Sequence, residues 1–151
     1  MLTLARQGQQ VSDMEPIDLG SFVETCWAKV ETATATVVAD IDTTIQADPS
    51  RVGQLLENLM RNAVEHGSED VTVRVGPLPD GFYVEDDGPG IPKDKRENVF
   101  EPGYSESQGG TGFGLAIVRQ IAYAHNWEVQ VTESPDGGAR FEFARVREAV
   151  S

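Results

Sequence analysis

Residues 48–66, DPSRVGQLLENLMRNAVEH, carry the pattern that decides the fold. Asp48 can cap a helix, and Pro49 suits its first turn. Apolar side chains then recur at helical spacing, namely Val52, Leu55, Leu56, Leu59, Met60, Ala63 and Val64. Gly67 can take the left-handed conformation that ends a helix. The sequence therefore predicts a long amphipathic helix that covers one side of a core.

The segments around this helix predict a mixed α+β fold. Apolar spacing indicates further helices over 19–31, with Asp18 as its cap, and over 115–124. Strands are expected at 34–41, 43–46, 71–75, 82–84, 127–132 and 139–144. Turns at 77–81 and 135–138 would join the later strands into two hairpins. We expect a two-layer α/β sandwich, with about three helices on one face of a mixed, mainly antiparallel sheet.

The composition fits one acidic domain. Its 25 Asp+Glu against 12 Lys+Arg give a net charge of −13, scattered along the 151 residues. This sign excludes a basic nucleic-acid surface, and no apolar run is long enough to cross a membrane. Salt would screen such a surface, so we interpret the chain as an intracellular protein of a halophilic archaeon; an ordinary acidic cytosolic domain is the alternative. Cys26, the single cysteine, cannot form an internal disulfide.

Three motifs carry candidate chemistry, and the first lies on the central helix. Asn58 and Asn62 are four residues apart and share a face, which Glu65 continues. A carboxamide offers a hard oxygen that suits Mg²⁺, and donors for phosphate or water. The same row also fits an ordinary solvated helix face.

The second motif, residues 84–92, reads VEDDGPGIP. Asp86 ends a predicted strand, and Gly88 and Gly90 allow a tight turn close to a ligand. A buried carboxylate at a strand end can accept a hydrogen bond from an exocyclic amine such as that of adenine. A plain acidic turn is the alternative.

The third motif, residues 109–115, reads GGTGFGL and runs directly into a helix. Small residues let backbone N–H groups approach phosphate oxygens, and the helix N-terminus favours an anion. It is neither a P-loop nor a dinucleotide fingerprint, and a flexible hinge is the alternative. The long connection between the second and third motifs favours a lid or binding loop.

Taken together and in this order, the motifs resemble the ATP-binding domain of sensor histidine kinases. These kinases share a Bergerat-type fold with gyrase, Hsp90 and MutL-type ATPases. Residues 57–63 (ENLMRNA) resemble the N box, and residues 86–90 (DDGPG) the G1 box. Residues 99–102 (VFEP) resemble the F box, and residues 110–115 (GTGFGL) the G2 box. The resemblance covers about 48–143.

The resemblance implies a role for each matching position. Asn62 would bind the Mg²⁺ that bridges the phosphates of ATP, with Asn58 supporting the metal and its waters. Asp86 would accept the adenine amino hydrogen. A base pocket would be shaped by Gly88, Gly90 and Ile91; Glu65 and His66 would neighbour the nucleotide. Residues 92–111 would form the lid, and the phosphates would be held by the amides of Gly110, Thr111, Gly112, Phe113, Gly114 and Leu115.

One position separates kinase from hydrolase. In the hydrolytic relatives a Glu stands four residues before the metal-binding Asn and activates water. Here that place is Asn58, which is no base, and Glu57 points about 100° away on a helix. The resemblance therefore implies phosphoryl transfer from Mg-ATP to a protein His. A Ser kinase resembling anti-sigma factors, or a nucleotide-binding regulatory module, is the alternative; an ATP-hydrolysing clamp is disfavoured.

The acceptor His is expected on a separate segment. Neither His66 nor His125 precedes a phosphoacceptor pattern, and His125 is interpreted as a structural residue at a helix end. Residues 1–14 resemble the tail and linker of a dimerisation helix, and residues 15–151 form the catalytic domain. The implied partners are the dimerisation and phosphoacceptor domain of a parent kinase and a downstream response regulator. The domain itself is expected in the cytoplasm, with no nucleic-acid or membrane contact.

Two departures from the family pattern concern charge. Glu65 stands where the family often has Lys or Arg, and a carboxylate there would repel phosphate unless it meets metal or its waters. The stretch 104–107, after the F box, lacks the basic residue often found there. We expect Lys93, Lys95 and Arg96 to compensate, or potassium to screen the charge.

Overall fold

The computed structural model describes residues 14–30, 35–66, 70–88, 90, 91, 94, 96, 114–135 and 137–147. The helices are α1 (Leu19–Trp27), α2 (Pro49–His66) and α3 (Gly114–Ala124). The strands are β1 (Glu15–Asp18), β2 (Thr36–Ala39), β3 (Thr44–Ala47), β4 (Thr72–Leu78), β5 (Gly81–Asp86), β6 (Glu128–Glu133) and β7 (Ala139–Ala144). The predicted tail at 1–14 lies almost entirely outside the described residues.

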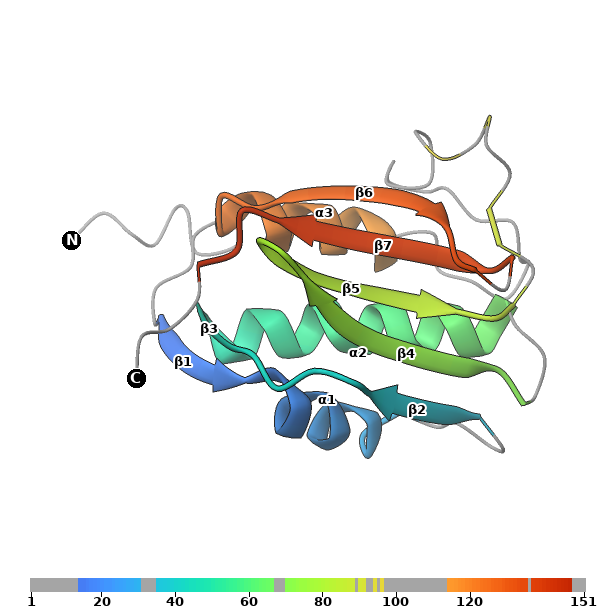
Figure 1. Cartoon of the computed structure of the whole chain (residues 1–151), viewed down its shortest axis with the longest axis horizontal. Coiled ribbons are helices and arrows are strands. Elements are labelled where there is room, and N and C mark those ends of the chain that lie inside the picture. Colours follow the sequence, from blue (N-terminus) through green and yellow to red (C-terminus); the bar gives the residue numbers. More distant parts are fainter. Residues whose placement is uncertain are drawn as a thin grey trace.

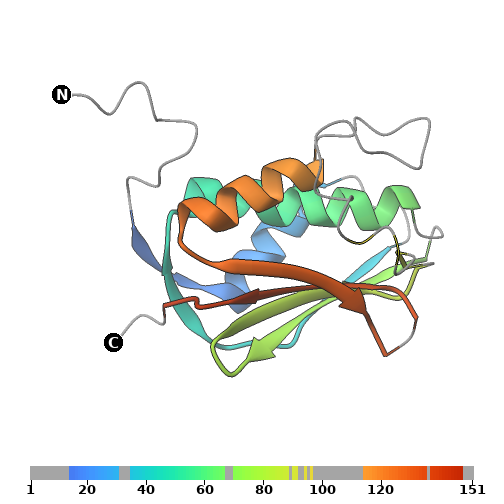
Figure 2. The ribbon, with the colours of Figure 1, turned by 90° about the horizontal axis from the view of Figure 1, so that it is seen from above.

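Within this part of the chain, five strands form the main sheet in the order β2-β4-β5-β7-β6. Strand β2 is parallel to β4, and the other neighbours are antiparallel. The three helices lie together on one face of this sheet, and the other face is left open (Figures 1 and 2). The predicted two-layer α+β sandwich with a mixed, mainly antiparallel sheet is therefore confirmed.

Strand alternation explains why only one face is covered. Successive side chains of a strand point to opposite faces, so the apolar ones form a single buried layer. In β5 and β7 this layer contains Phe82, Val84, Phe141 and Phe143, all nearly inaccessible to solvent. Phe82 stacks on Phe143 with ring centroids 4.9 Å apart, across the register that pairs them. The apolar stripe of α2 covers this layer, as its spacing predicts.

The start of α2 is tied to the end of α3 by a buried histidine. Asp48 Oδ1 accepts the backbone N–H groups of Ser50 and Arg51 at 3.0 and 3.4 Å, so Asp48 caps α2 as predicted. The backbone N–H of Asp48 donates to Nε2 of His125 at 3.1 Å, and Nδ1 of His125 donates to the Ile121 carbonyl at 2.8 Å. His125 therefore has the structural role predicted for it.

Several predicted boundaries are wrong. Helix α1 ends at Trp27 instead of 31, and the side chain of Asp18 makes no capping hydrogen bond to it. Pro16 indicates a break in regular structure, and no strand is predicted at 15–18, but this stretch forms β1, which pairs with β3. Pro16 is tolerated because β1 belongs to a two-stranded sheet, where an edge strand needs no second partner. Strands β4 and β5 continue into the predicted turn at 77–81.

No helix in the described ranges is both long enough and apolar enough to span a membrane.

Candidate functional site

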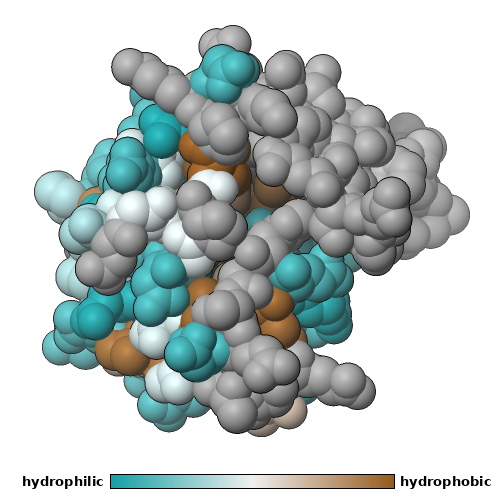
Figure 3. All heavy atoms as spheres, turned by 90° about the vertical axis from the view of Figure 1, so that its right-hand side faces the viewer, coloured by the Kyte–Doolittle hydropathy of each residue, from teal (hydrophilic) through white to brown (hydrophobic). Residues whose placement is uncertain are grey.

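Predicted site residues lie on β5, on α2 and at the start of α3. Strand β5 ends at Asp86 at one end of the sheet, where β7 begins and α2 also ends (right side of Figure 1). Helix α3 starts further back, alongside α2 (Figures 1 and 2). Figure 3 looks onto this end, where hydrophobic and hydrophilic residues are exposed side by side. Polar side chains therefore stand beside apolar surface, as a site for an amphipathic ligand requires.

Asp86 is the most constrained acidic residue at this end. Its Oδ1 accepts the backbone N–H of Gly88 at 2.9 Å and that of Ala139 at 3.2 Å. Burial raises the pKa of Asp86 above its ordinary value, and the two backbone donors partly oppose this shift. A half-buried carboxylate held by two donors on one oxygen is oriented, so its other oxygen can present an acceptor in a fixed direction.

The loop after Asp86 has the tight geometry that its glycines predict. Gly90 has a φ of +78°, in the region that favours glycine. A Cβ on Gly90 would lie 2.5 Å from the Gly137 carbonyl oxygen, so the loop also needs the small residue for close approach. Asp87 Oδ1 accepts the backbone N–H of Thr72 at 2.8 Å, which ties the loop to the start of β4. Ile91 is half-buried and packs against the core.

The polar row on α2 is present as the helical spacing predicts. Asn58 and Asn62 are half-buried, and Glu65, nearest the end of the helix, is exposed. Arg61, half of whose side chain is exposed, donates to Asn58 Oδ1 at 3.5 Å and pairs with Glu57 at the same distance. Glu57 therefore faces Arg61 and lies off the asparagine row. His66 is the last residue of α2, and its side chain is outside the described set.

The third motif is described only at its end. Gly114 is the first residue of α3, and Leu115 is half-buried against the core. The predicted phosphate-binding residues Gly110, Thr111, Gly112 and Phe113 lie outside the described residues, as does the predicted F box.

Arg96 forms a hydrogen bond and an ion pair within the protein. Its Nε donates to the Ile91 carbonyl at 3.1 Å, and its guanidinium lies 4.0 Å from the carboxylate of Glu133. These contacts place Arg96 beside the loop that follows β5. Lys93 and Lys95, the other two residues expected to compensate for missing charge, are outside the described part of the chain.

Sequence reasoning missed the contribution of the turn between β6 and β7. Ser134 Oγ donates to the Asp86 carbonyl at 2.9 Å, and the same oxygen accepts the Gly138 N–H at 2.8 Å. Residues 135–138 (PDGG) predict a turn there, but nothing in the sequence placed that turn against Asp86.

Among the described residues, no group of three or more His, Cys, Asp or Glu could hold a metal ion. The amide oxygens of Asn58 and Asn62 are hard ligands that a divalent cation could use together with oxygens of a bound ligand. Mg²⁺ is commonly bound in this way, with few protein ligands plus phosphate and water.

Comparisons with known proteins agree with one another. A model of the family described as histidine kinase-, DNA gyrase B-, and HSP90-like ATPase matches residues 47–150. The adaptive-response sensory kinase SasA of Nostoc sp. is 38% identical over 108 residues, covering 66% of this chain and 27% of that protein. The sensor protein RstB of Escherichia coli is 34% identical over 160 residues, covering 95% of this chain and 37% of that protein. The chain thus spans well under two thirds of these relatives.

Solved structures give the same result. The mycobacterial sensor histidine kinase MprB superposes with a TM-score of 0.76 at 25% identity, covering 89% of this chain and 100% of that one. Full-length ShkA, solved in complex with AMPPNP, superposes with a TM-score of 0.76 at 28% identity. That match covers 97% of this chain and 34% of ShkA.

Proposed function

Because the chain belongs to the family of histidine kinase-, DNA gyrase B- and HSP90-like ATPases, we propose that it binds Mg-ATP at the end of the sheet marked by Asp86. It is homologous to the catalytic ATPase domain of two-component sensor histidine kinases. We further propose that it transfers the γ-phosphate to a His on a separate domain of a longer kinase. The observation that carries this proposal is the half-buried, oriented carboxylate of Asp86 beside the turn that contains Gly88 and Gly90.

The adenine end of the site rests on Asp86. Two backbone N–H groups hold its Oδ1, so we assign Oδ2 to the adenine amino group. The small residues Gly88 and Gly90 would leave room for the base, and Ile91 would contribute an apolar wall. Apolar contacts would bind the ring of the base, and the acceptor on Asp86 would select adenine through its amino group.

The phosphate end rests on α2 and on the start of α3. Asn62, with Asn58 beside it, would supply hard amide oxygens to Mg²⁺ and its waters. The metal would neutralise charge on the phosphates. Backbone N–H groups of Gly110 to Leu115 would face the phosphates at the N-terminus of α3.

The negative charge of Glu65, near the proposed phosphate site, can be screened by ions in the solvent. Glu65 is exposed at the last turn of α2, so the surrounding ions can reach it. We propose that the protein works at high salt, as its net charge of −13 suggests, and that potassium offsets this carboxylate. Urea unfolding between about 0.1 and 3 M KCl tests this point. Equal stability across that range would contradict a halophilic origin.

The side chain at position 58 supports transfer over hydrolysis. Asn58 occupies the position from which a carboxylate would activate water, and Glu57 is turned toward Arg61. We therefore propose that the domain positions ATP for attack by an acceptor imidazole. That acceptor would belong to a dimerisation domain whose tail is residues 1–14, with a response regulator downstream, in the cytoplasm. A separate regulatory role or a Ser kinase activity is not favoured by the relatives.

Nucleotide binding can be tested on this chain directly. We expect a fluorescent ATP analogue to bind, and Mg²⁺ to strengthen the binding. Asn62→Ala should reduce the Mg²⁺-dependent part of the affinity by about 10- to 100-fold. Gln54→Ala, an exposed position on the same helix, should leave both affinities unchanged. A folded wild-type protein that binds no adenine nucleotide would refute the proposal.

Phosphoryl transfer needs an acceptor in the assay. The domain is mixed with a purified dimerisation and phosphoacceptor domain of a sensor kinase and with radiolabelled ATP. Label on the acceptor that is stable to base and lost in acid identifies phosphohistidine. Appreciable phosphate release by the isolated domain would instead indicate hydrolysis.

A further inference from the structure

We propose that Ser134 is a positioning residue for base recognition: its hydroxyl clamps the turn between β6 and β7 onto Asp86 and so sets the preference for a 6-amino purine. This inference rests on the proposed function, because it assumes that Asp86 accepts the adenine amino group. It adds a residue outside the four boxes to the nucleotide site.

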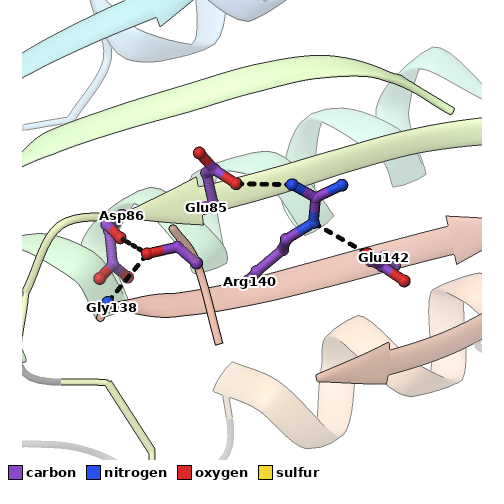
Figure 4. Close-up of polar contacts among 6 residues, drawn as sticks. Glu85, Asp86, Gly138, Arg140 and Glu142 are labelled. Carbon is purple, nitrogen blue, oxygen red and sulfur yellow. Dashed lines mark hydrogen bonds and ion pairs between the residues drawn. The ribbon is translucent and has the colours of Figure 1, made fainter. Parts of the chain in front are cut away.

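The hydroxyl of Ser134 is buried, and it both donates and accepts a hydrogen bond. Only 4% of Ser134 is exposed. Its Oγ donates to the Asp86 carbonyl at 2.9 Å and accepts the Gly138 N–H at 2.8 Å. Figure 4 labels these two partners, Asp86 and Gly138. The backbone N–H of Ser134 also donates to the Gly138 carbonyl at 2.8 Å. One hydroxyl therefore bridges the strand that ends in Asp86 and the turn that precedes β7.

Close backbone contact reinforces this bridge. A Cβ on Gly138 would overlap the Asp86 carbonyl and lie 2.6 Å from Asp86 Oδ1. The contact between Gly90 and the Gly137 carbonyl is equally tight, at 2.5 Å from a Cβ position on Gly90. The turn thus meets the loop after β5 at two points, which small residues alone permit.

The clamp reaches the carboxylate through the next residue. Ala139 follows Gly138 directly, and its N–H donates to Asp86 Oδ1. Without the Ser134 hydroxyl, the buried Asp86 carbonyl and Gly138 N–H would both lose a partner, and the turn would shift to find new ones. Ala139 would move with the turn, so the direction of the Asp86 carboxylate would be less well fixed.

A less well-fixed carboxylate should affect one class of nucleotide selectively. The amino group of adenine donates to a carboxylate, whereas hypoxanthine carries a carbonyl oxygen at the same position. Inosine diphosphate lacks the exocyclic amino donor, so it cannot form the hydrogen bond that adenine would make to Asp86, and its affinity reports the other contacts of the site. The ratio of the ADP affinity to the inosine diphosphate affinity therefore reports the orientation of the Asp86 carboxylate separately from general damage to the fold.

The test is calorimetry of the whole chain in molar KCl with ADP and with inosine diphosphate. For Ser134→Ala we expect ADP affinity to fall about 5- to 20-fold and inosine diphosphate affinity to change less than about twofold. Ser134→Thr, which keeps the hydroxyl, should retain the wild-type ratio. Ser21→Ala, which removes an exposed hydroxyl on α1, is the matched control.

The outcomes separate this inference from the proposed function. A folded Ser134→Ala with an unchanged ratio would overturn the inference alone. A wild type that does not distinguish the two nucleotides would overturn the inference and also the assignment of Asp86 to the adenine amino group. A folded wild type that binds neither would overturn the proposed function. If Ser134→Ala does not fold, Ser134→Cys replaces it in the test, because a thiol has nearly the same volume as the hydroxyl but is a weak donor. We expect the same fall in the ratio of ADP affinity to inosine diphosphate affinity.

Discussion

Replacing Asp86 by Asn should separate nucleotide binding from stability. The carboxamide has nearly the shape of the carboxylate, and its single oxygen can still accept from Gly88 and Ala139. The second position, which we assign to the adenine amino group, becomes an NH₂ donor. Two donors would then face each other in the base pocket.

The expected loss of affinity follows from this reversal. A hydrogen bond to a charged group contributes about 1.5–3 kcal/mol, and a buried donor left without a partner costs about 1–3 kcal/mol. Together they predict a loss of about 2.5–6 kcal/mol, or roughly a 10²- to 10⁴-fold rise in the Kd of ADP. Calorimetry in molar KCl measures this change.

Stability should move the other way. Burial raises the pKa of Asp86, so the folded state binds this proton more tightly than the unfolded state. As the pH rises from the ordinary Asp pKa of about 3.9 to the raised value, Asp86 therefore lowers the free energy of unfolding. The Asp86→Asn variant has no ionisable group at this position, so its free energy of unfolding does not fall in this way. At pH 7 that free energy should be no lower than the value for the wild type.

The control is the neighbouring carboxylate. Asp87 is exposed and bonds only to the backbone N–H of Thr72 among the described residues, so Asp87→Asn should keep ADP affinity within about threefold. Urea unfolding of all three proteins between pH 4 and 7 completes the comparison. Wild-type affinity in Asp86→Asn, or a clear loss of stability, would refute our account of this residue.

Three further predictions concern residues away from the nucleotide. Burial lowers the pKa of His125, against the opposing charge of Asp48, so the unfolded state takes up this proton first and urea stability should fall as the pH drops through about 6.5. His125→Phe should flatten that part of the pH profile, and an unchanged profile would contradict the buried neutral imidazole. Burial raises the pKa of Cys26 to about 11, so iodoacetamide at pH 8 should react about 100-fold more slowly with the folded chain than with the chain in urea. Equal rates would show that the thiol is accessible. Arg140→Ala should lower the free energy of unfolding by about 1–3 kcal/mol, because the buried Glu85 loses its partner at 3.0 Å, while the Kd of ADP stays within about twofold. A large loss of ADP affinity would instead link the open face of the sheet to the site.

The helices and strands could be read from the sequence because their signals are local. The stripe on α2 follows from apolar spacing, and Asp48 caps the helix with its own side chain. The row of Asn58 and Asn62 follows from the same periodicity. Local signals were misleading where a strand depends on a partner far away in the sequence. Pro16 indicates a break, but that stretch is a strand because it pairs with β3.

The sequence by itself determined the fold class and the motifs that point to a nucleotide, because helix and strand periodicity and glycine-rich turns depend on neighbouring residues. Only the tertiary structure showed that Ser134 and Ala139 hold Asp86, and that His125 ties the start of α2 to the end of α3. These partners are 48, 53 and 77 positions apart in the chain. A hydrogen bond across such a separation depends on strand order and register, which the whole core fixes together and which leave no periodic trace in the sequence.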